Sequence, residues 1–177
     1  IASMPSKLAD CHSKDRSRCE LYLTEGDSAS GGCKIIRDAS FQAILGLRGK
    51  VLNCLTADMK RIQKNAEIID IIKALGLQWA ADGQSVIYDE KKLRYDKLII
   101  AADKDPDGSH IQSLICTMLW ALVPDLILDG HVYVALPPLY KAEWGKQYEY
   151  LDDKKALEEF KKKHKDFTLT YFKGLGE

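Results

Sequence analysis

The sequence predicts an α/β fold, with a largely parallel sheet of about four strands and helices on both faces of that sheet. Short apolar runs that are typical of buried strands alternate with segments in which apolar residues recur at helical spacing. Strands that alternate with helices favour parallel pairing, because the helices make the crossover connections. With 177 residues, 46% of them hydrophobic, the chain is long enough for one or two packed layers around a core.

Four short apolar segments predict the strands. They are Glu20–Thr24, Lys97–Ala102, His131–Leu136 and Thr168–Phe172. The polar residues 1–19 are expected to form an arm or linker from a preceding domain, and residues 78–92 an irregular insertion. The main domain is therefore expected over residues 20–177, as a fragment of a longer chain.

Four segments predict helices. One carries apolar residues at helical spacing from Ile111 to Leu122, with a capping-box pattern at Ser109 and Gln112 before it and Pro124 as its stop. The others are expected at Asn65–Leu75, closed by Gly76, at Asp152–His164, and directly after Gly26.

Composition excludes one class of protein and leaves others open. The 26 basic and 26 acidic residues balance, so net charge alone does not indicate a nucleic-acid partner, although a basic face can lie beside an acidic site. No apolar stretch approaches the roughly 18 residues that a membrane span requires, so no membrane partner is expected. The five cysteines form no C-x-x-C pattern and are interpreted as reduced thiols.

The segment DKDPDGSHI places Asp103, Asp105 and Asp107 directly after a predicted strand. Carboxylates so close together repel one another unless a cation lies between them. The pattern D-x-D-x-D-G also begins an EF-hand calcium loop, but that loop needs a bidentate Glu at its twelfth position, where this chain has Leu114. An EF-hand also needs a helix before the loop, so calcium is disfavoured.

Two other interpretations of the aspartates involve phosphate chemistry. In a phosphatase of the haloacid-dehalogenase type, the first Asp of a D-x-D at a strand end is the nucleophile. The alternative is a magnesium site acting on a phosphodiester, because carboxylates at strand ends lie at the edge of an open α/β sheet where ligands bind. Such a site needs another acid from a neighbouring strand, and Glu25 follows the strand Glu20–Thr24. Asp27 or Ser28 can cap the helix that begins after Gly26.

Together the two acidic segments resemble a Toprim domain, and further motifs resemble the B-type subunit of type IIA DNA topoisomerases, such as gyrase B and its counterpart in topoisomerase IV. The motifs occur in the same order over essentially the whole chain: MPSKLADC, ELYLTEGDSASGG, LRGKVLN, DKDPDGSHI, GHVYVALPPLYK and YFKGLGE. The resemblance implies a Toprim-type, Rossmann-like fold for residues 20–177. It also implies a preceding ATPase domain that binds ATP, and a cytoplasmic protein located with nucleoid or viral-factory DNA.

The same resemblance implies a role for each acid. Glu25, Asp103 and Asp105 would be the catalytic residues that hold Mg²⁺ at the DNA cleavage site, with Asp107 as a nearby or alternate metal ligand. The nucleophile would be a tyrosine of a partner A-type subunit, so the isolated fragment is expected to be inactive. The function implied is therefore reversible cleavage and religation of double-stranded DNA within an assembly.

Further positions match family residues outside the acidic cluster. Lys50, Asn53 and Arg48 match positions that contact DNA, and Asp27 and Arg48 match positions associated with quinolone-type drugs. The chain departs from the usual pattern at Lys104, which puts a positive charge among the predicted ligands. Two alternatives stay open: a stand-alone metal-dependent phosphatase or nuclease, and a non-catalytic scaffold for subunit contact.

Overall fold

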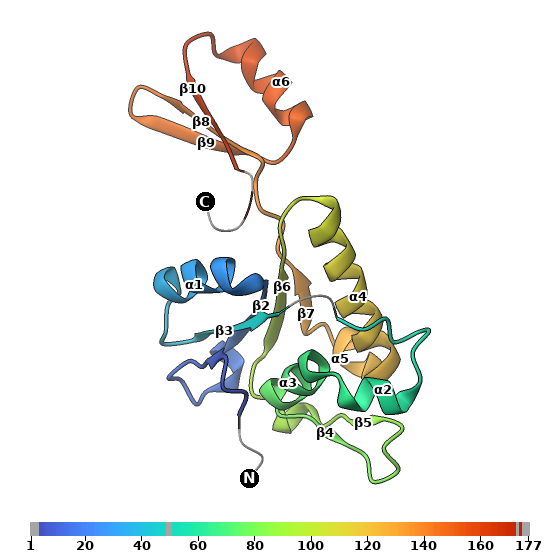
Figure 1. Cartoon of the computed structure of the whole chain (residues 1–177). Helices are drawn as coiled ribbons and strands as arrows, with labels where there is room; N and C mark the ends of the chain where they lie inside the picture. The colour runs from blue at the N-terminus through green and yellow to red at the C-terminus, as the bar shows by residue number, and fades with distance from the viewer. Residues whose placement is uncertain (1–3, 49–50, 173, 175–177) are drawn as a thin grey trace.

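A five-stranded sheet forms the centre of the computed structural model, which describes residues 4–48, 51–172 and 174. Its strand order is β1-β3-β2-β6-β7 (Figure 1). The four strands from β3 to β7 run parallel, and β1 pairs antiparallel with β3. The predicted largely parallel sheet is therefore confirmed. Its strands are β1 (Leu8–Ala9), β2 (Glu20–Glu25), β3 (Gln42–Leu47), β6 (Lys97–Ala101) and β7 (Val132–Val134).

Strands β1 and β3 were not predicted. Every residue of β3 from Ala43 to Leu47 is buried. Because both faces of this strand are covered, its sequence shows no polar–apolar alternation. The N-terminal arm contributes β1, in which Leu8 pairs with Leu45. The arm is therefore an edge strand of the main sheet.

Helices cover both faces of the sheet. Helix α1 (Gly26–Ile36) lies on the face that carries Tyr22 and Ile44. The other face packs against α3 (Ala66–Leu75) and α4 (Pro106–Leu122) in the main hydrophobic core. That core includes Leu21, Leu23, Leu45, Leu98 and Ile100 from the strands and Ile68, Ile71, Ile115, Met118 and Leu119 from the helices.

The ends of the helices follow local capping chemistry. Helix α3 begins where the side chain of Asn65 accepts a hydrogen bond from the backbone N–H of Ile68, and it ends at Gly76, whose φ of +82° suits glycine. Pro124 ends α4 and also begins the short helix α5 (Pro124–Leu128), since proline fits the first position of a helix. Helix α2 (Met59–Lys64) precedes α3.

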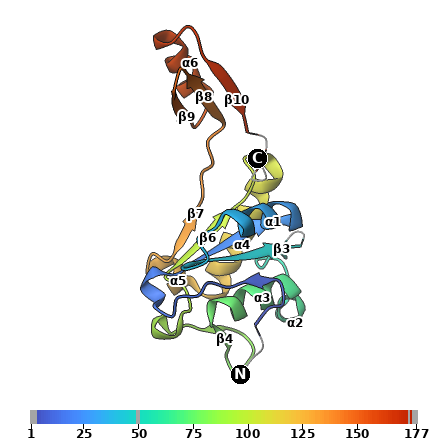
Figure 2. The same ribbon diagram turned by 90° about the vertical axis from the view of Figure 1, so that its left-hand side faces the viewer.

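Residues 139–172 form a second unit, called here the C-terminal unit. Strands β8 (Tyr140–Trp144), β9 (Gln147–Leu151) and β10 (Thr168–Tyr171) make an antiparallel sheet in the order β10-β8-β9, and α6 (Lys154–Lys163) packs on one face of it. Figures 1 and 2 show the C-terminal unit standing beyond the carboxyl ends of the main strands, joined by the extended segment after β7. The predicted strand at Thr168–Phe172 is present, but in this second sheet.

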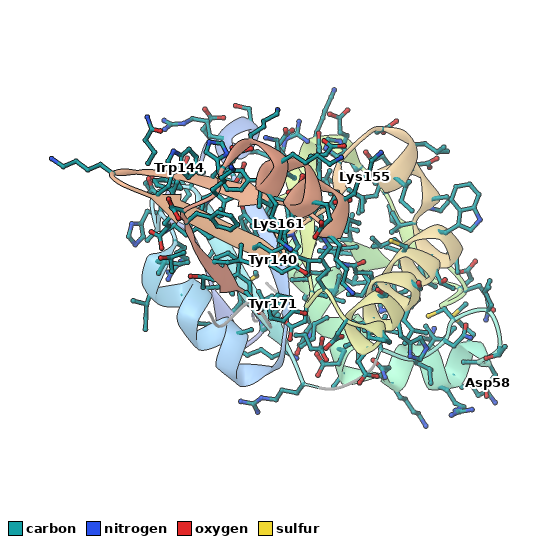
Figure 3. The ribbon with its side chains drawn as sticks, turned by 90° about the horizontal axis from the view of Figure 1, so that it is seen from above. Asp58, Tyr140, Trp144, Lys155, Lys161 and Tyr171 are labelled. Carbon is teal, nitrogen blue, oxygen red and sulfur yellow. The ribbon has the colours of Figure 1, made fainter. Side chains whose placement is uncertain are left out.

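The C-terminal unit has a small core of its own, separate from the main core. Ala142, Leu151, Leu157 and Phe160 are its buried residues. Tyr140 and Tyr171 lie next to each other, with ring centroids 5.4 Å apart, and Trp144 meets Phe160 edge-on at 5.1 Å. Figure 3 labels Tyr140, Trp144 and Tyr171, which belong to the three-stranded sheet.

The remaining segments are short. The predicted insertion holds a two-stranded hairpin of β4 (Gln78–Trp79) and β5 (Val86–Ile87), and the 3-10 turns η1 (Arg16–Arg18) and η2 (Glu90–Lys92) lie outside the sheets. In the part of the chain that the structure describes, no helix is both long and apolar enough to cross a membrane. The five cysteines are free, and burial raises the pKa of the Cys11 thiol to about 11, so that it is protonated at neutral pH.

Candidate functional site

The two acidic segments meet at one edge of the main sheet. Strands β2 and β6 are adjacent and parallel, with Thr24 opposite Ala101. Glu25 is the last residue of β2, and Asp103 lies two residues beyond the end of β6. Because the carboxyl ends of parallel strands lie at the same edge of a sheet, the register brings Glu25 and Asp103 to neighbouring positions there.

The turn from β2 into α1 is made without the predicted cap. Helix α1 begins at Gly26, whose φ of +75° lets the chain turn directly out of the strand. Asp27 and Ser28, expected as capping residues, lie inside the first turn, and Glu25 is the capping position with no side-chain cap hydrogen bond. The carboxylate of Glu25 is therefore not used to start the helix. The side chain of Asp27 lies outside what the structure describes.

Asp105 starts helix α4. Its side chain accepts a hydrogen bond from the backbone N–H of Gly108 at 2.7 Å, and Pro106 occupies the first helical position. The predicted capping box at Ser109 and Gln112 is therefore wrong, because the cap is Asp105, four residues before Ser109. A carboxylate has two oxygens, so Asp105 can accept from Gly108 with Oδ1 while Oδ2 binds a cation. Asp107 lies exposed in the first turn.

The two roles of Asp105 can be separated by substitution. Asp105→Asn is expected to keep α4 intact, because Asn caps helices as well as Asp, whereas Asp105→Ala should lower the free energy of unfolding by about 1 kcal/mol. Both variants remove the charge, so both should weaken metal binding. Urea unfolding and a Mg²⁺ titration of each variant measure the two effects. Equal stability of the Asn and Ala variants would contradict the capping role.

Two glycines let other segments approach Asp103. A Cβ at Gly108 would overlap the carbonyl oxygen of Asp103 and stand 2.9 Å from its carbonyl carbon. A Cβ at Gly174 would stand 3.0 Å from Oδ2 and 3.2 Å from Oδ1 of Asp103. Gly174 therefore lies against the carboxylate of Asp103. In the sequence Gly174 belongs to the motif YFKGLGE, in which no pattern indicates a contact with the acids.

Lys104 does not place its charge among the acids. Its Nζ donates hydrogen bonds to the main-chain oxygens of Asp152 and, at 3.5 Å, of Pro137. Both acceptors belong to the C-terminal unit or to the segment that leads to it. The positive charge that the sequence placed among the predicted ligands is therefore directed toward that unit.

The residues expected to contact DNA lie in and before the β3–α2 connection. Arg48 is exposed and directly follows β3, whose last residue, Leu47, pairs with Glu25. Asn53 is also exposed, and its Oδ1 accepts a hydrogen bond from the N–H of Leu55 at 3.0 Å. Lys50 lies outside the described residues. Arg48 is thus beside the acidic edge, and Asn53 has a local structural role.

The carboxylate oxygens at this edge of the sheet suit a hard cation such as Mg²⁺. Among the described residues, no three His, Cys, Asp or Glu side chains are gathered into a ready ligand cluster. Mg²⁺ does not require one, because it commonly takes one or two carboxylates and keeps waters in its other positions. Carboxylates from the ends of two adjacent strands fit that requirement. The assignment of Glu25, Asp103, Asp105 and Asp107 as ligands stays a prediction.

Known proteins with similar sequences support the resemblance to the Toprim domain family. Residues 20–137 match the Toprim domain family. The chain is 46% identical to the B-type subunit of DNA gyrase from Spiroplasma citri over 99% of its length, and 44% identical to that from Thermotoga maritima, also over 99%. It is 48% identical to that of Campylobacter jejuni over 90% of its length. The chain spans only 27%, 27% and 20% of these relatives, respectively.

The family match covers four of the five strands of the main sheet (β2, β3, β6 and β7), the helices around them and the strand ends that carry both acidic segments. The part of the chain beyond residue 137, which contains the C-terminal unit, lies outside the match. The resemblance predicted from the motifs is confirmed: the chain belongs to the Toprim domain family.

Proposed function

We propose that the chain is the Mg²⁺-binding part of a type IIA DNA topoisomerase, and that it supports reversible cleavage and religation of both DNA strands. The observation that carries the proposal is the register of β2 and β6, which brings Glu25 and Asp103 to one edge of a Toprim sheet. Similarity to the B-type subunits of gyrases supports it, since the match extends over nearly the whole chain and so includes both acidic segments.

In this proposal the acids hold a cation and do not attack the DNA. Glu25 and Asp103 would bind Mg²⁺ from adjacent strand ends, Asp105 would add its second oxygen, and Asp107 would lie within reach at the start of α4. When bound, Mg²⁺ would neutralise the scissile phosphate and the 3′-oxygen that leaves and returns. Because β2 and α4 are packed into the main core, Glu25 lies at the end of one rigid element, and Asp105 and Asp107 lie at the start of another.

The basic and amide side chains at the same edge would bind the DNA backbone. Arg48 follows β3 beside Glu25 and can reach a phosphate as a fixed positive charge. Lys50 would add a second charge, and Asn53, whose Oδ1 is used locally, would donate from its amide nitrogen. Asp27 and Arg48 would also be the residues that a quinolone-type drug contacts.

The other parts of the reaction would come from outside this chain. The nucleophile would be a tyrosine of the A-type subunit, and ATP would bind to a domain of the same polypeptide that precedes residue 1. The protein would act on DNA in the cytoplasm. On its own the chain would bind Mg²⁺ but would not cleave DNA.

The test is the covalent protein–DNA complex. The full-length protein, assembled with its A-type subunit and supercoiled DNA, should form Mg²⁺-dependent complexes in which the 5′-phosphate is attached to the A-type subunit. A chelator added before the detergent should abolish these complexes, and this chain without its partner should leave the DNA intact. Attachment of DNA to this chain, or phosphatase or nuclease activity without the partner, would contradict the proposal.

A further inference from the structure

The acidic loop 103–107 meets the C-terminal unit at several points. Lys104 donates to the carbonyl oxygen of Pro137, in the segment that enters the unit, and to that of Asp152, between β9 and α6. Gly174, two residues beyond the unit, lies against the carboxylate of Asp103. The entry, the middle and the exit of the C-terminal unit therefore all contact one short loop.

No shared core holds the two units together in the part of the chain that the structure describes. The main core and the core of the C-terminal unit have no residue in common. Figures 1 and 2 show the unit projecting from the main sheet on its connecting segment. Among the described residues, the ammonium group of Lys104 supplies two polar contacts to this unit and its connecting segment.

We propose that Lys104 is a positioning residue, which latches the C-terminal unit onto the metal-binding loop and so fixes the backbone between Asp103 and Asp105. The inference rests on the proposed function, because it takes these two acids as ligands of Mg²⁺. Both acceptors are main-chain oxygens, so the latch depends on the shape of the C-terminal unit and not on its side chains. Movement of the unit would then change how readily the loop binds the cation.

A latch and a simple positive charge have opposite effects on metal binding. If Lys104 acted only through its charge, removing that charge would relieve repulsion and lower the Mg²⁺ concentration that cleavage requires. If Lys104 is a latch, its removal loosens the loop and raises that concentration. The direction of the change therefore distinguishes the two roles.

The first readout uses the metal-free protein. The backbone N–H of Leu139 is bonded to the oxygen of Leu151 at 3.0 Å, and that of Phe172 to the oxygen of Leu139 at 2.9 Å, where the chain enters and leaves the C-terminal unit. In the full-length protein with its A-type partner and a chelator, Lys104→Met should speed hydrogen exchange at these amides roughly threefold to tenfold. Lys104→Arg, which can donate to the same oxygens, should exchange like the wild type.

The second readout is the half-saturating Mg²⁺ concentration for DNA cleavage. Lys104→Met should raise it roughly threefold to tenfold, and Lys104→Arg should leave it near the wild-type value. Lys155→Met is the matched control, since Lys155 is exposed on α6 (Figure 3). It should change neither quantity.

Three results would overturn the latch: unchanged exchange in Lys104→Met, an unchanged or lowered Mg²⁺ requirement, or equal impairment in Lys104→Arg. Failure of the proposed function gives a different result, because then the wild-type assembly forms no Mg²⁺-dependent complex. In that case hydrogen exchange in the metal-free protein still tests whether Lys104 holds the C-terminal unit in place. Wild-type exchange rates in Lys104→Met would show that the hydrogen bonds of Lys104 do not hold it.

Discussion

Replacing Glu25 with Gln, or Asp103 with Asn, is expected to slow Mg²⁺-dependent DNA cleavage by the assembled enzyme roughly a hundredfold or more. Each substitution keeps the size and shape of the side chain and removes the charge that a cation binds. The two acids come from the ends of neighbouring strands, so each substitution removes one charged ligand from the predicted set. The measurement is the rate of covalent complex formation as a function of Mg²⁺ concentration.

The matched control is Glu20→Gln. Glu20 begins the strand that Glu25 ends, and its carboxylate contacts Tyr22, Gln42 and Lys97 at the opposite edge of the sheet. Cleavage by this variant should equal that of the wild type. All three variants should unfold at similar urea concentrations in the absence of metal. If Glu25→Gln or Asp103→Asn cleaves DNA at the wild-type rate, the substituted residue is not a metal ligand. If Glu20→Gln loses as much cleavage activity as they do, the loss comes from a general effect on the sheet.

The parts of the fold that could be predicted from sequence are those with a clear local signal. Strands β2 and β6 are apolar runs followed by polar turns. Identifying these two strands was enough to predict that the acidic segments lie at one edge of the sheet. Strand β3 was missed because both of its faces are buried, which erases the alternation that marks a strand. The strand at Thr168–Tyr171 was recognised but assigned to the wrong sheet, because periodicity identifies a strand and not its partner.

The start of α4 shows how two local signals can compete. Ser109 and Gln112 have capping-box spacing, but Asp105 followed by Pro106 offers both a cap and a preferred first residue four positions earlier. The extended backbone of Asp105, with φ −130° and ψ 174°, is the one that the following proline favours. The same residue that is predicted to bind the metal therefore also sets the direction of the helix behind it.

Contacts made over long sequence separations could not be predicted at all. Lys104 reaches Asp152, and Gly174 reaches Asp103, only because the C-terminal unit is placed over the acidic edge. Nothing in the local sequence of either partner encodes that placement. The residues of the candidate site were thus accessible from motifs, whereas the segments that surround them required the three-dimensional arrangement.

Gly108→Ala is expected to lower the free energy of unfolding by about 3 kcal/mol, the upper end of the usual cost of overpacking. An added Cβ would overlap the carbonyl oxygen of Asp103 and lie 2.9 Å and 3.0 Å from its carbonyl carbon and its nitrogen. All three are backbone atoms, which cannot rotate away as a side chain can. Relief of the overlap must therefore move the metal-binding loop away from the first turn of α4.

This displacement of the loop should abolish DNA cleavage even where the variant stays folded. It shifts Asp103 relative to Glu25, and it breaks the hydrogen bond from the N–H of Gly108 to the side chain of Asp105. Gly32→Ala is the control: Gly32 lies within α1, nothing stands within 4 Å of its added Cβ, and alanine favours helix by about 1 kcal/mol. That variant should be as stable as the wild type or more so. Wild-type stability of Gly108→Ala in urea, together with normal cleavage, would show that the close approach to Asp103 does not constrain the loop.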